Sequence, residues 1–253
     1  MTVTFLGTGT SQGVPVIACD CDVCTSADPR DKRLRSSVMI ENDGKVIVID
    51  SGPDFRCQML RENVQRLDAI VFTHEHKDHI AGLDDIRAFN YKQQAPIDVY
   101  ATKRVQEALK HEFHYIFADF KYPGIPQVTF HTIGDDPFFI GDLKFIPIEV
   151  MHYMLPVLGF RINDFTYITD AKTVAEKEVE KIKGSKILVI NALQKQNHIS
   201  HFTFDEAIAF ARMIGAEKTY FTHISHRLGK HADISKMLPA GIELAYDGLK
   251  LVV

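Results

Sequence analysis

Four potential metal ligands lie within six residues of one another, directly after an apolar run. The run from Ala69 to Thr73 is followed by His74, His76, Asp78 and His79. His74 and His76 are two positions apart, which suits an extended segment or a tight loop, whereas histidines four apart share one helical face. The segment therefore predicts a strand that ends at a metal site, with one ligand pair for each of two ions.

Three further apolar, β-branched runs each lead to one more potential ligand, namely His152, Asp170 and His223. A threonine directly precedes Asp170 and His223, as Thr73 precedes His74. Rigid strands that release ligands at a common edge hold a metal site well. Imidazole and carboxylate ligands suit Zn, Mn or Fe(II), and the sequence does not choose between these metals.

The rest of the chain alternates short strands with amphipathic helices, without a repeat or a linker. Helical spacing predicts helices at 103–117, 174–183 and 204–214, with Thr203 as the N-cap of the last. Hairpin turns are predicted at 42–44 and around 141–142. Strand-rich stretches followed by helix-bearing ones, twice over, predict an α+β fold of two packed sheets with helices outside. We expect residues 1–253 to form a single domain of two similar halves.

Composition and charge narrow the class of protein. The formal net charge of -4 argues against a strongly basic surface for nucleic acid. The first residues lack the charged and apolar regions of a secretory signal, and no apolar run is long enough to cross a bilayer. We therefore expect a cytoplasmic protein with neither a membrane nor a nucleic acid as partner. A homodimer is compatible with the sequence.

The ligand pattern resembles the HxHxDH signature of the metallo-β-lactamase superfamily, which stands here at 74–79. The resemblance runs from Phe5 to the C-terminus. It implies a four-layer αββα sandwich, in which two packed mixed β-sheets have helices outside and the site lies at the sheet edges. It also implies two catalytic divalent metals, Zn or Mn or else Fe. One would be held by His74, His76 and His152, the other by Asp78, His79 and His223, with Asp170 bridging them.

Three cysteines in the first long loop form a CxCxxC pattern, Cys19, Cys21 and Cys24. In a reducing compartment such thiols converge on Zn²⁺, which needs a fourth ligand. The resemblance narrows to the cyclic phosphodiesterases of phosphonate breakdown, which share CxCxxC, the THISH stretch ending at His226 and the HFTFDEA stretch at His201. This likeness implies His226 as the fourth ligand of one structural Zn. A thiol cluster without metal is the alternative, and Cys57 is predicted to pack in the core.

Two metals that share a hydroxide suit attack on a phosphodiester, whose charge they offset. The departing alkoxide then needs a proton, and His201, just before a predicted helix, is the candidate general acid. The resemblance gives a histidine at this place the same role. It also gives an aspartate at the position of Asp50 a role in supporting the ligands, and we count Asp50 and Asp78 with His201 as catalytic residues. The predicted substrate is a small cyclic phosphate, either a phosphoribosyl or a nucleoside cyclic phosphate.

Two other functions stay open. A tRNA 3′-end processing endonuclease of the same fold carries a long glycine-rich and basic arm between the bridging aspartate and the last histidine, where this chain has a charged helix and one strand. A non-catalytic, metal-stabilised binding protein in cofactor biosynthesis shares CxCxxC but has a broken HxHxDH pattern. The complete pattern at 74–79 argues against that second alternative.

Overall fold

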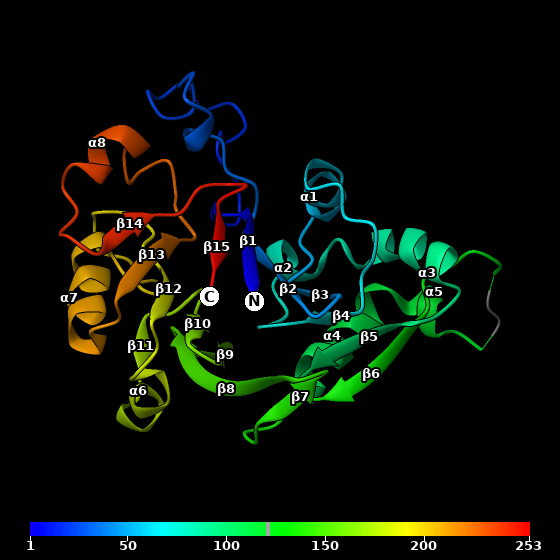
Figure 1. Cartoon of the computed structure of the whole chain (residues 1–253). Coiled ribbons are helices and arrows are strands. Elements are labelled where there is room, and N and C mark those ends of the chain that lie inside the picture. The colour runs from blue at the N-terminus through cyan, green and yellow to red at the C-terminus, as the bar shows by residue number, and fades with distance from the viewer. Residues whose placement is uncertain (120–121) are drawn as a thin grey trace.

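Two mixed β-sheets lie face to face, and helices cover the outer face of each (Figure 1). The computed structural model describes residues 1–119 and 122–253. The first sheet has the order β15-β1-β2-β3-β4-β5-β6, with strands Lys250–Val252, Thr2–Gly7, Ser37–Asn42, Lys45–Ile49, Ala69–Val71, Ile97–Ala101 and Val128–Thr132. The second has the order β11-β8-β9-β10-β12-β13-β14, with strands Thr173–Val174, Leu143–His152, Leu155–Ile162, Phe165–Tyr167, Ile187–Asn191, Lys218–Thr222 and Ile242–Leu244, and β7 (Phe138–Ile140) pairs with β8.

Each sheet repeats one pattern of strand directions. Antiparallel β1, β2 and β3 are followed by parallel β4, β5 and β6, and antiparallel β8, β9 and β10 by parallel β12, β13 and β14. The first sheet is covered by α1 (Phe55–Arg61), α2 (Lys77–Ile80), η2 (Leu83–Ile86), α3 (Arg87–Gln93), α4 (Lys103–Glu112) and α5 (His114–Phe117). The second is covered by α6 (Glu176–Ile182), α7 (Phe204–Ile214) and α8 (His231–Ser235). The predicted fold class is confirmed.

Alternating side chains give each strand two buried faces. In β3, Ile47 and Ile49 face the second sheet, whereas Val48 faces the helices. In β9, Phe160 faces the first sheet and Val157 faces the helices of the second. The period of two along a strand therefore builds three apolar layers, one between the sheets and one under each set of helices.

The predicted helices differ from the observed ones at their ends. The helix predicted at 103–117 is interrupted at Phe113, whose φ of -111° and ψ of 43° are not helical, so α4 and α5 are separate. The helix predicted at 174–183 begins at Glu176, because Thr173–Val174 pairs with β8 as β11. Thr203 caps α7 as predicted, and Glu206 completes a reciprocal capping box.

One cysteine prediction is wrong. Cys57 lies in α1, as its helical surroundings indicate, but it is exposed rather than packed in the core. The side chains of α1 that do face the sheet are Phe55 and Met59, at positions four apart on the other side of the helix.

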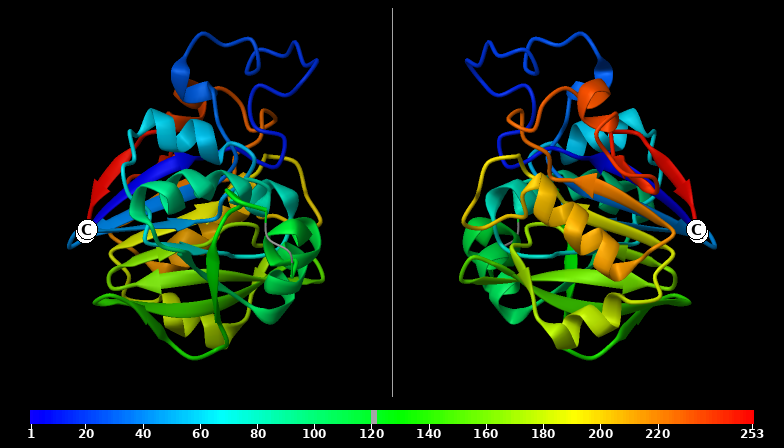
Figure 2. Two further views of the ribbon diagram at one scale, coloured as in Figure 1. Left: turned by 90° about the vertical axis from the view of Figure 1, so that its right-hand side faces the viewer. Right: turned by 90° about the vertical axis from the view of Figure 1, so that its left-hand side faces the viewer.

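The segment between β1 and β2 projects from the body of the molecule (Figure 2). It includes the short 3-10 helix η1 (Pro29–Asp31). Arg33 attaches its base, because the buried guanidinium Nη1 donates to the Thr8 hydroxyl at 2.8 Å and to the Ala245 carbonyl oxygen at 2.7 Å. Within the described part of the chain, no helix has the length and apolar character needed to cross a membrane.

We expect Phe160→Ala to lower the free energy of unfolding by about 3–5 kcal/mol, because it leaves a cavity between the two sheets. Phe160 is fully buried there beside Phe138 and Phe145. Urea unfolding followed by circular dichroism, at fixed metal concentration, measures the change. Phe139→Ala is the matched control, because this ring on β7 is 61% exposed. Similar losses in both variants would contradict the described packing.

Candidate metal centre

Strand ends of both sheets bring the predicted ligands to one place. His74 follows β4 of the first sheet, whereas His152 ends β8, and Asp170 and His223 follow β10 and β13 of the second. Ligand atoms lie within 4.8 Å of one another in three groups: His74, His79 and Asp170; Asp78, His79 and His223; and His152, Asp170 and His201. The second group is one of the two ligand sets expected from the sequence.

His76 lies on the other side of His74. Its Nδ1 is 3.0 Å from Nε2 of His74, and its ring centroid is 5.3 Å from that of His152. The His74 and His152 rings are 6.1 Å apart. The three histidines expected to share the first metal are thus mutual neighbours, with His76 exposed at the outer edge.

Backbone geometry at the strand ends turns the side chains toward the centre. Asp50, Asp170 and His223 each follow a strand, and their φ angles are 63°, 55° and 53°. The left-handed region is sparsely populated outside glycine, although Asp and His enter it more readily than bulky residues do. Non-glycine residues held in this region gather at functional sites, because the surrounding structure must impose the conformation.

Asp50 fixes the ligand loop from behind. Its Oδ1 accepts from the backbone N–H of Thr73 at 2.8 Å, and its Oδ2 accepts from the Thr73 hydroxyl at 2.8 Å and from Nδ1 of His79 at 2.7 Å. Asp50 itself is fully buried and lies outside the three ligand groups. It therefore orients His79 instead of contacting a substrate, a role that carboxylates often have behind metal-binding histidines.

Some ring nitrogen atoms of this centre have no hydrogen-bond partner, and they are available to bind metal ions. Nε2 of His79 is buried without a hydrogen-bond partner, 3.2 Å from Oδ2 of Asp78 and 3.3 Å from Oδ2 of Asp170. Nδ1 of His152 is held by the carbonyl oxygen of Ser200 at 2.9 Å, which leaves its Nε2 free. Buried polar groups normally have partners, and nitrogen and carboxylate atoms aimed at one point are the donors that divalent transition metals prefer.

The charges of the centre depend on one another. Burial disfavours a charge on His79, but the carboxylates of Asp78, Asp170 and Asp50 outweigh it and raise the pKa of His79 well above its usual value. Burial likewise opposes ionisation of Asp170, yet His223 and His79 hold the pKa of this carboxyl well below its usual range. Desolvation lowers the pKa of His74, which favours the neutral ring that binds metals.

His201 lies inside the centre. It is 7% exposed, its ring stacks on His223 at 4.9 Å, and its Nδ1 is 3.8 Å from Oδ1 of Asp170. The chain directly after it is fixed, because the Phe202 N–H donates to the carbonyl oxygen of Ala171 at 2.7 Å. Burial lowers the pKa of His201 to about 2, so the ring is neutral when no anion is bound. His201 also forms a potential ligand group with His152 and Asp170, and the sequence did not predict this group.

Some residues that support the ligands were not predicted from the sequence. Asn191, at the end of β12, clamps the residue after Asp170: its Oδ1 accepts from the Ala171 N–H at 2.8 Å and its Nδ2 donates to the Ala171 carbonyl at 3.0 Å. The Ser36 hydroxyl lies 3.2 Å from Nδ1 of His223. A polar residue at the end of an apolar strand is the signal that could have identified Asn191.

Gly52 allows the ligand loop to approach the end of β3. A Cβ atom at this position would lie 2.0 Å from the carbonyl oxygen of Asp78. No side chain therefore fits between the segment after Asp50 and the turn that carries Asp78 and His79.

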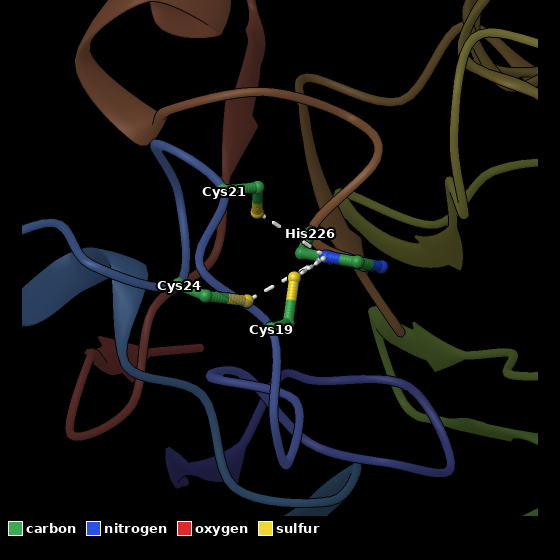
Figure 3. Close-up of side chains that lie close together, drawn as sticks. All are labelled: Cys19, Cys21, Cys24 and His226. Carbon is green, nitrogen blue, oxygen red and sulfur yellow. Dashed lines mark hydrogen bonds between the residues drawn. The ribbon is translucent and has the colours of Figure 1, made fainter.

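The three cysteines and His226 form a second cluster (Figure 3). The Sγ atoms of Cys19, Cys21 and Cys24 lie 3.3, 3.4 and 3.5 Å from Nδ1 of His226. In tetrahedral coordination, Zn–S bonds of about 2.3 Å and Zn–N bonds of about 2.0–2.1 Å place sulfur and nitrogen about 3.6 Å apart. This donor set therefore fits Zn²⁺, and it joins the projecting segment to the chain three residues after His223.

The thiols of this cluster differ in acidity. The backbone N–H of Cys24 and the ring of His226 lower the pKa of Cys21 to about 6, whereas burial raises that of Cys24 to about 11. A coordinated cation deprotonates thiols outright, so it would remove this difference.

Comparison with known proteins places these features in a family. The sequence profile described as "Beta-lactamase superfamily domain" matches residues 45–224. An octanoyltransferase of Porphyromonas gingivalis is 40% identical over 256 residues, which cover 100% of this chain and 52% of that protein. The chain therefore spans about half the length of this relative. The coenzyme PQQ synthesis protein B of Methylorubrum extorquens is 31% identical over 224 residues, or 76% of this chain and 72% of that protein.

Solved structures show the same architecture. A diphosphatase from the PhnP family superimposes with a TM-score of 0.93 at 44% identity, over 100% of this chain and 97% of the other. The short form of human tRNase Z gives a TM-score of 0.73 at 19% identity, over 100% and 99% of the chains. At that lower identity the similarity shows the fold alone.

We expect Asp50→Asn to weaken metal binding at this centre by about 10- to 100-fold. The amide nitrogen that replaces Oδ2 can only donate, so the Thr73 hydroxyl and Nδ1 of His79 lose their common acceptor. Chelator competition measures the affinity. Asp164→Asn, at an exposed ion pair with Lys186, is the matched control. Unchanged metal affinity in Asp50→Asn would show that this carboxylate does not position His79.

Proposed function

This chain belongs to the metallo-β-lactamase superfamily of hydrolases, and from that premise we propose that it is a metal-dependent phosphodiesterase acting on a small cyclic phosphate. The observation that carries the proposal is the meeting of imidazole and carboxylate groups from both sheets, with His201 beside Asp170. The 44% identical solved relative is named as a diphosphatase, which supports a substrate that contains phosphate. A phosphoribosyl and a nucleoside cyclic phosphate both fit this description.

The residues of the centre match the needs of such a reaction. Two divalent cations, Zn or Mn or else Fe, would supply charge neutralisation and an acidified water as nucleophile. His74, His76 and His152 would hold one cation, Asp78, His79 and His223 the other, and Asp170 would contact both. The chain contributes orientation: Asp50 fixes the His79 ring, and Ser200 fixes the His152 ring. His79 and Asp170 are buried, and the low dielectric around them strengthens electrostatic interactions with the phosphate.

His201 is the proposed general acid. Its buried Nδ1 has no hydrogen-bond partner, so it is available to a bound molecule. A phosphodiester adds negative charge beside the ring, which favours the imidazolium and raises its pKa from the low value of the empty pocket. The protonated ring then donates to the departing alkoxide.

Other functions of relatives are less well supported. A ribonuclease Z of Nostoc is 26% identical over 173 residues. Between Asp170 and His223, where we expected one charged helix and one strand, the chain forms α6 and α7 with β11, β12 and β13, and these elements belong to the second sheet and its helices. A metal-stabilised binding role, suggested by the PQQ synthesis protein B, does not need the full HxHxDH set that stands here at 74–79. The octanoyltransferase name describes a protein of which this chain spans about half, and we assign no octanoyl transfer.

We expect the purified protein to hydrolyse bis(p-nitrophenyl) phosphate in the presence of Mn²⁺ or Zn²⁺. His76→Ala should abolish this activity, and elemental analysis should show loss of metal from the centre but retention of one Zn at the cysteines. His111→Ala, an exposed histidine on α4, is the control and should match the wild type. Cleavage of tRNA precursors without hydrolysis of small diesters would favour the endonuclease instead.

His201→Ala should retain the wild-type metal content but slow substrates with poor leaving groups by about 10²–10⁴-fold, the usual contribution of a general acid. Nitrophenolate needs little protonation, so bis(p-nitrophenyl) phosphate should be affected far less. Steady-state kinetics on an alkyl and a nitrophenyl diester measure the difference. Equal losses on both substrates would remove the general-acid assignment.

A further inference from the structure

A hollow of about 450 Å³ opens directly beside the metal centre. Its volume falls within the roughly 300–1,000 Å³ of small-molecule sites. Its lining consists of the two predicted ligands His76 and His152, the polar residues Arg104 and Ser200, and the largely apolar side chains of Tyr153, Met154, Leu155 and Ile199. Because His76 and His152 border both spaces, a phosphate held at the centre would place its remaining groups in this hollow.

Large apolar side chains line the hollow without being buried. Tyr153, Met154 and Ile199 are 56%, 76% and 64% exposed. Scattered exposed apolar residues are ordinary, but three that line one hollow next to a polar centre form a patch of the kind that marks ligand sites. They come from two segments far apart in the sequence, the β8–β9 turn and the loop before His201.

The turn that carries Tyr153 is strained. Tyr153 and Met154 join β8 to β9, whose last pair is His152 and Leu155, and the φ of Tyr153 is 57°. Two-residue hairpin turns normally place Gly, Asn or Asp where φ is positive, because a bulky side chain is unfavourable there. Glycine would form this turn more easily, so the tyrosine has no advantage for the turn itself. Strain of this kind beside a ligand such as His152 points to function.

Arg104 indicates the chemistry of the group that fits. Its Nη2 donates to the carboxylate of Glu75 at 2.5 Å, so its charge is already balanced, while its side chain stays 54% exposed. A balanced guanidinium is a poor clamp for a second phosphate, but its planar face stacks well on an aromatic ring. The hollow therefore suits a flat, uncharged group better than a second anion.

We propose that this hollow binds the base of a nucleoside cyclic phosphate, with Tyr153 stacking on the base and Met154 and Ile199 packing against it. The inference rests on the proposed phosphodiesterase function and narrows its substrate class. It selects a nucleoside over a phosphoribosyl cyclic phosphate that lacks a base. Stacking on aromatic side chains accepts any base, so it does not require one particular nucleoside.

Kinetics of Tyr153→Gly test the assignment. Glycine suits the positive φ, so the turn and the fold should persist. With adenosine 2′,3′-cyclic phosphate we expect kcat/KM to fall roughly tenfold or more, chiefly through KM. With the 2,3-cyclic phosphate of methyl riboside, which lacks a base, the loss should be at least about fivefold smaller. Tyr91→Ala, an exposed tyrosine on α3, is the matched control and should change neither value. Equal losses on both substrates, or none on the nucleoside, would overturn the proposal.

Calorimetric titration with adenosine 2′-monophosphate separates this inference from the proposed function. If no phosphodiester is hydrolysed but the nucleotide binds and Tyr153→Gly weakens that binding about tenfold, the base site stands and the phosphodiesterase function fails. If diesters are hydrolysed while Tyr153→Gly leaves both KM and nucleotide binding unchanged, the base site fails alone. Absence of both hydrolysis and nucleotide binding overturns both.

Discussion

Imidazole and carboxylate groups buried together at the strand ends impose the constraint on which the rest of this structure depends. Burial penalises a charge on each of them, and only their mutual contacts make the cluster tolerable. The pKa values of His79 and Asp170 shift in opposite directions because each stabilises the charged form of the other. Asp50 joins this cluster to the backbone, since one carboxylate holds both the Thr73 segment and the His79 ring. The centre and the fold are therefore one network of contacts.

The repeated sheet pattern explains why ligands from distant parts of the chain can meet. In each half, antiparallel strands lead into parallel ones, and parallel strands direct their carboxyl ends to one edge. β4 delivers its ligands from the first half, and β13 delivers His223 from the second. The apolar layer between the sheets, which includes Phe160, sets the distance between the halves and hence between the ligands that each half contributes.

The sequence alone predicted the fold class and the residues that meet, because ligand type and strand periodicity are local signals. The pairing of groups was harder to predict. That Asp50 contacts His79 and that Asn191 clamps Ala171 depends on packing between segments twenty or more residues apart. The break at Phe113 and the exposure of Cys57 also escaped prediction, because helical spacing does not reveal a non-helical residue or which face a helix buries. Tyr153 gave no sequence signal, since its strain exists only in the folded turn.

The cysteine cluster also links the fold to the metal centre. His226 lies three residues after His223, in a segment whose backbone is bonded to the turn after β1: the Ile224 N–H donates to the Thr8 carbonyl at 2.9 Å. A cation held by the three thiolates and His226 would therefore fix the far end of the segment that presents His223 to the catalytic centre. His223 adopts a left-handed conformation, which needs restraint from both sides to persist. β13 provides that restraint before it, and the loop bound at the cysteines provides it after. The projecting segment would thus restrain His223 through a cluster that is separate from the other three ligand groups.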